Sequence, residues 1–78
     1  MRTASETLDQ YYLEMRWRAL SLAADLDRVG RAPGGPGVLR DDPRLLKLNR
    51  ALKVLLEAGE GRAEQVQMIF SDTTPPPK

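Results

Sequence analysis

The chain has 78 residues, with 12 Lys and Arg against 11 Asp and Glu, and 41% of its residues are hydrophobic. It contains neither cysteine nor histidine, which excludes disulfides, thiolate metal sites and the side chain most often used in metal binding and acid–base catalysis. A chain this short forms one domain at most, and its core supplies only about 3–5 kcal/mol of net stability. We therefore expect it to associate with other chains.

The first third of the chain predicts one long amphipathic helix over about residues 4–29. Thr3 and Glu6 fit the T-x-x-E capping box at its start. Glu14 and Arg18 have the spacing of a favourable i,i+4 ion pair. Apolar residues with heptad spacing form a first stripe along this helix: Leu8, Tyr12, Met15, Ala19, Leu22, Leu26 and Val29.

A second apolar stripe lies on the same helix, about 150° away from the first at 100° per residue. Its members are Leu13, Trp17, Leu20 and Ala24. One partner helix can cover only one of the two stripes. We therefore predict that the second stripe is an interface with another chain, with Trp17 as its anchor.

The middle of the chain predicts a turn-rich connection. Gly30 stands where a left-handed residue ends a helix, and Gly34-Gly35-Pro36-Gly37 predicts a surface loop. The alternative, a glycine-rich phosphate cradle, requires a preceding strand that the sequence does not predict.

Asp42 and Pro43 are a typical N-cap and first helical residue, and they predict a second helix over about 43–58. Its leucines have the same heptad spacing, and this spacing continues in step to Val66 and Ile69. We therefore expect the helical part that follows the connection, the second arm, to be about as long as the first helix. Glycines at positions 59 and 61 predict a kink or break, with a short third helix over about 62–71. Residues 73–78 predict a disordered, proline-rich tail.

These elements predict an all-α protein, an antiparallel helical hairpin with its second arm kinked or broken near Gly59-Gly61. The domain is expected to span residues 1–72 and to assemble into a helical bundle. The N-terminus lacks the apolar run of a signal peptide and no stretch has the ~20 apolar residues of a membrane span, so we expect a cytoplasmic protein without a membrane partner.

Basic residues gather on the second helix and just before it, on the side away from its leucines: Arg40, Arg44, Lys47, Arg50 and Lys53. They could bind an anion such as a nucleic-acid backbone. The alternative is that they are solvated or pair with acids of the first helix.

No pattern of catalytic residues stands out. Asp25 and Asp27 diverge by about 200° on a helix, and Asp41 and Asp42 are placed to favour a helix N-terminus. We therefore expect no enzymatic activity, cofactor, metal or small-molecule substrate. The expected function is a protein-interaction module that forms a homo-oligomer, most simply a dimer, or binds another helical protein. The alternative is a small nucleic-acid-binding protein that uses the basic face.

Overall fold

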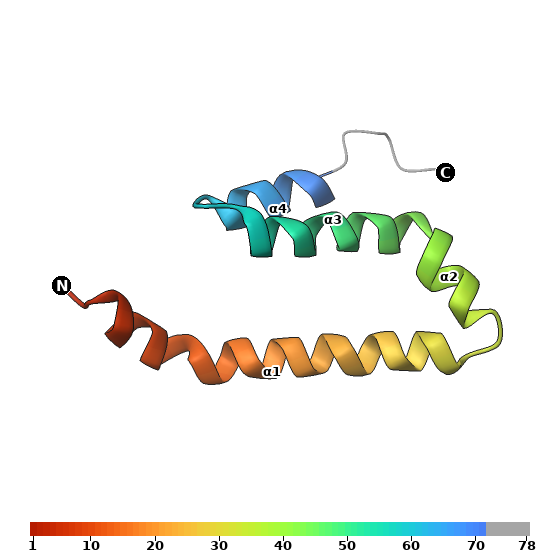
Figure 1. Ribbon diagram of the computed structural model, residues 1–78, viewed down its shortest axis with the longest axis horizontal. Coiled ribbons are helices and arrows are strands. Elements are labelled where there is room, and N and C mark those ends of the chain that lie inside the picture. Colours follow the sequence, from red (N-terminus) through yellow and green to blue (C-terminus); the bar gives the residue numbers. More distant parts are fainter. Residues whose placement is uncertain (72–78) are drawn as a thin grey trace. The chain divides into compact units, whose positions relative to one another are not determined.

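The structure is a computed structural model that describes residues 1–71. Four helices follow one another along the chain: α1 (Ala4–Arg31), α2 (Gly35–Asp41), α3 (Pro43–Glu57) and α4 (Arg62–Phe70) (Figure 1). The described residues contain no strand, so the predicted all-α class is confirmed. The predicted tail, residues 73–78, lies outside the described residues.

The chain divides into two compact units, Met1–Pro36 and the part from Gly37 onward. The first unit contains α1 and the beginning of α2, and the second contains the rest of α2 with α3 and α4. The antiparallel hairpin, the single domain over 1–72 and the assembly into a bundle stay predictions.

The predicted capping box closes the N-terminus of α1. The Thr3 hydroxyl accepts a hydrogen bond from the Glu6 amide at 3.1 Å, and the Glu6 carboxylate accepts one from the Thr3 amide at 3.0 Å. Further along, Arg18 donates to Glu14 at 2.8 Å as the i,i+4 spacing predicted. Both predictions are confirmed.

Replacing Thr3 with alanine is expected to destabilise the first turn of α1 by about 1 kcal/mol, because the Glu6 amide loses its acceptor. Amide hydrogen exchange should become faster over the first turn and stay unchanged beyond it. Ser5→Ala is the matched control, since the Ser5 side chain makes no hydrogen bond within residues 1–71. Equal exchange in the two variants would contradict the role of the cap.

Acid should loosen the same turn. The hydrogen bonds with Thr3, the backbone one foremost, lower the pKa of Glu6 from its ordinary value. The stabilisation that this carboxylate provides is therefore present above its ordinary pKa and is lost as the pH falls through the lowered folded-state pKa. Amide exchange over the first turn, corrected for intrinsic rates, should lose protection in that window. In Glu6→Gln, whose amide oxygen accepts at every pH, protection should stay flat.

The C-terminus of α1 differs from its prediction. The helix continues through Gly30 to Arg31, and Ala32 is the extended C-cap residue. An extended conformation is what a residue before proline favours, and Pro33 follows directly. The left-handed residue is Gly34, with φ +80°. The prediction of Gly30 as a left-handed cap is therefore wrong by four residues.

The glycine-rich segment is not a loop throughout, because α2 begins at Gly35. The Gly35 amide donates to the Ala32 carbonyl at 2.8 Å, and a proline in the first turn costs a helix no hydrogen bond. Gly35 is buried against the end of α1, so closely that a Cβ atom there would collide with the carbonyl oxygens of Val29 and Gly30. Glycine is thus required for a close backbone approach.

The second unit contains the predicted helix start and the predicted break. Asp42 caps α3 by accepting the Arg44 amide at 2.8 Å, and Pro43 is its first residue. Helix α3 ends at Glu57 and α4 begins at Arg62, and Gly61 between them has a left-handed backbone with φ +67°.

The helix α4 folds back and packs against α3 (Figure 1). The Arg62 guanidinium Nε ties the two helices together by donating to the Leu55 carbonyl at 3.0 Å. The expectation that the second arm equals the first in length is therefore wrong, because the chain reverses at the glycines.

Candidate protein interface

The second apolar stripe lies open on α1. Leu13, Trp17 and Leu20 are 63%, 67% and 53% exposed, and Ala24 is half-buried. Scattered apolar side chains on a surface are ordinary, whereas a contiguous apolar row marks an interaction site. The structure therefore places the four predicted interface residues on one line along α1, of which Leu13, Trp17 and Leu20 are exposed.

A shallow groove runs along the C-terminal part of this stripe. Asp25 and Arg28 form one edge through an ion pair of 2.7 Å, which is exposed and so contributes little to stability. The small Ala24 side chain leaves space beside the larger Trp17. The groove residues are Trp17, Leu20, Ser21, Ala24, Asp25 and Arg28.

The N-terminal half of the first stripe is also open, since Leu8, Tyr12 and Met15 are each about half exposed. No residue of α1 is fully buried. This part of the helix therefore presents apolar side chains on two opposite sides, as the sequence predicted.

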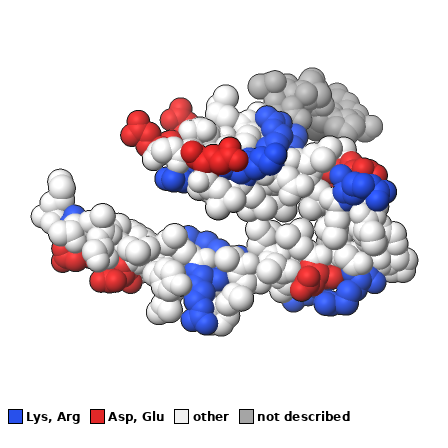
Figure 2. All heavy atoms as spheres, in the orientation of Figure 1, with Lys and Arg blue, Asp and Glu red and all other residues white. Residues whose placement is uncertain are grey.

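Charge is distributed unevenly along α1. Figure 2 shows acidic side chains toward its beginning, basic ones near its middle and both kinds near its end. Glu6 lies in the first turn, and Arg28 and Arg31 lie in the last. Acids at the N-terminus and bases at the C-terminus also complement the helix dipole.

The five candidate anion-binding residues do not form one open basic face. The Arg40 guanidinium pairs with Asp41 at 3.1 Å. Arg44 makes two side-chain hydrogen bonds with Asp42, both of 3.0 Å. This contact lowers the pKa of Asp42 and raises that of Arg44. Two of the five cations are thus already paired, each with a neighbouring carboxylate.

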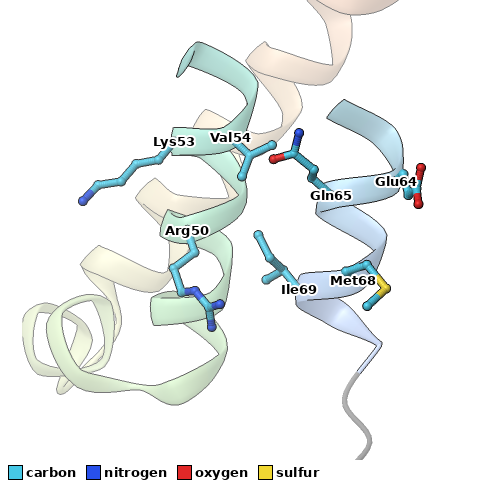
Figure 3. A pocket seen from close by; sticks show the side chains of 7 residues that line it. All are labelled: Arg50, Lys53, Val54, Glu64, Gln65, Met68 and Ile69. Atoms are coloured by element: carbon cyan, nitrogen blue, oxygen red, sulfur yellow. The ribbon is translucent and has the colours of Figure 1, made fainter. Parts of the chain in front are cut away.

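The remaining basic residues belong to α3, where Lys47 is half-buried and Arg50 and Lys53 are exposed. Arg50 and Lys53 border a second groove, between α3 and α4. Figure 3 shows Val54 and Ile69 pointing into this groove, whereas Lys53 and Glu64 extend away from it. All its residues are Arg50, Lys53, Val54, Glu64, Gln65, Met68 and Ile69. Its apolar floor and outward charges are more typical of a peptide contact than of a phosphate site.

The sequence did not predict this second groove. It placed Ile69 on a continuing seam, whereas the reversal at the glycines turns that residue back toward Val54. The signal was present in Gly59 and Gly61, but a break fixes only where a helix stops and not the direction in which the chain leaves.

None of the helices in the described part of the chain is both long and apolar enough to cross a membrane. Residues 1–71 also contain no cluster of three acidic side chains that could hold a metal ion. The chain matches no protein-family model, no curated protein and no solved structure.

Proposed function

We propose that this chain is a small protein-interaction module without enzymatic activity, and that it self-associates through Leu13, Trp17, Leu20 and Ala24 of α1. The observation that supports the proposal is the exposure of three large apolar side chains in a row on one continuous helix. Tryptophan is enriched among residues that dominate binding energies. A second copy is the simplest partner, because it is present wherever the chain is present.

The magnitudes favour a weak dimer. Covering six half-exposed Leu and Trp side chains, three from each copy, contributes about 1–2 kcal/mol per side chain. Association costs about 4–15 kcal/mol in lost freedom of motion. The two sums are of similar size, so a micromolar dissociation constant, which corresponds to about −8 kcal/mol, requires further contacts across the interface beyond the stripe.

The test is sedimentation equilibrium from about 1 to 100 μM, the range around that affinity. Fluorescence provides a second measurement, because Trp17 is the only tryptophan. Its emission should shift to shorter wavelength as the dimer forms. A monomer with unchanged emission over the whole range would contradict self-association and leave a different helical protein as the partner.

The alternative, nucleic-acid binding, rests on Arg50 and Lys53, which make no ion pair within residues 1–71. A salt series with duplex and single-stranded DNA and RNA distinguishes the two functions. Phosphate binding requires an affinity that falls steeply with added salt. Association through an apolar stripe does not.

A further inference from the structure

We infer that two copies pair antiparallel along α1, with Trp17 of each copy against Leu20 of the other and Leu13 against Ala24. In this register the numbers of facing residues add up to 37. The inference rests on the proposed self-association and adds its orientation and register. A second copy of this chain covers the stripe, because the charges at the two ends of the stripe are complementary.

The line of the stripe ends in opposite charges. At 100° per residue, Glu6 and Arg31 lie within about 10° of the centre of the stripe. In the antiparallel register Glu6 therefore faces the partner's Arg31, and by symmetry the pair forms twice. The Glu6 carboxylate uses one oxygen on Thr3, and Arg31 makes no hydrogen bond or ion pair within residues 1–71. Both groups can thus bind across the interface.

The parallel arrangement brings like charges together. When two copies of α1 align in parallel and in register, each residue faces itself, so Glu6 meets Glu6, Asp27 meets Asp27 and Arg31 meets Arg31. Facing like charges oppose association. In the parallel pair the two helix dipoles also point the same way, which is unfavourable for dipoles that lie side by side. In the antiparallel pair they point in opposite directions, which is favourable.

Neighbouring antiparallel registers are also disfavoured. A shift of one heptad toward the N-terminus places Leu20 against the partner's Gln10 and Ala24 against the partner's Glu6, so two stripe residues lose their apolar partners. A shift of one heptad the other way places Trp17 against the partner's Asp27. Only the middle register covers all four stripe residues with apolar partners.

Side-chain sizes fit the same register. Leu13 of the partner comes to lie over Ala24, at the groove that Trp17, Leu20 and Ala24 border. A large side chain over a small one is how packed helices interdigitate. The two Trp17 side chains lie on either side of the symmetry axis, about 4.5 Å apart along the helices.

The first experiment exchanges the terminal charges. Sedimentation equilibrium and Trp17 emission measure dimerisation of the wild type, Glu6→Arg, Arg31→Glu and the double variant. Each single variant should raise the dissociation constant about tenfold, because two attractions become two repulsions. The double variant should return to within about threefold of the wild type, because opposite charges face each other again.

Two controls separate this effect from others. Thr3→Ala removes the N-terminal cap and keeps the charge of Glu6. Arg16→Glu changes the net charge as Arg31→Glu does, but in the proposed register Arg16 faces the uncharged Ser21. Both controls should associate within about threefold of the wild type. Weakening by Arg16→Glu as large as by Arg31→Glu would overturn the register.

The second experiment measures orientation directly. The chain has no cysteine, so Ser5→Cys introduces a single site for a spin label. In the proposed register the two labels lie about 40 Å apart along the helices, whereas a parallel pair holds them within about 20 Å. The short distance, or equal affinity of all charge variants, would overturn the antiparallel register while self-association stands. A wild type that never dimerises would overturn both proposals.

Discussion

Trp17→Ala is expected to weaken self-association at least thirtyfold while α1 keeps its helicity. Truncating a central tryptophan in an interface costs about 2 kcal/mol or more, and each 1.4 kcal/mol is tenfold in affinity. The fold itself should change little, since Trp17 is 67% exposed in the single chain and alanine is the better helix former.

Sedimentation equilibrium measures the association of this variant, and far-ultraviolet circular dichroism at high dilution measures its helicity. Leu56→Ala is the matched control, because Leu56 is an exposed apolar residue of α3 outside the stripe. Equal weakening by the two variants would show that the apolar surface acts without specificity. Unchanged association of Trp17→Ala would place the interface elsewhere.

Gly35→Ala is expected to destabilise the chain by about 2–3 kcal/mol. The added methyl group would meet the carbonyl oxygens of Val29 and Gly30, and backbone atoms cannot yield as the end of a flexible side chain can. Inserting one carbon into a closely packed site costs about 1–3 kcal/mol. Helix α2 would have to move away from the end of α1 or lose its first turn.

Gly37→Ala is a control in the same helix, and it is expected to change the stability in the opposite direction. The nearest atom to a Cβ at Gly37 is the Arg40 Nη2 at 3.8 Å, an ordinary contact. Alanine in an unstrained helical position stabilises by about 0.5–1 kcal/mol. Urea denaturation followed by circular dichroism measures both variants. If both glycines respond alike, the close approach at Gly35 does not determine the stability of this turn.

The sequence predicted best where one local interaction decides the structure. The Thr3–Glu6 cap, the Asp42 cap and the break before Arg62 each depend on a few neighbouring residues, and all three are confirmed. Local chemistry of this kind is strong enough to act without help from distant parts of the chain.

The prediction failed where local signals compete. Gly34, Gly35 and Gly37 together with Pro36 are typical of a loop, yet α2 starts among them, where the Gly35 amide donates to the Ala32 carbonyl at the end of α1. The reversal of α4 onto α3 also depends on packing, which no spacing of residues reveals. Helical periodicity in the sequence predicted the apolar stripe of α1. It did not predict the groove between α3 and α4.

The exposure of α1 makes its resistance to local opening depend on protein concentration. A helix of 28 residues without a buried side chain has little tertiary packing to hold it, and isolated helices are marginal in water. A partner that binds only the folded helix adds RT ln(1 + [L]/Kd) to its stability. Monomeric chains therefore open more often than dimers and are cleaved first by proteases.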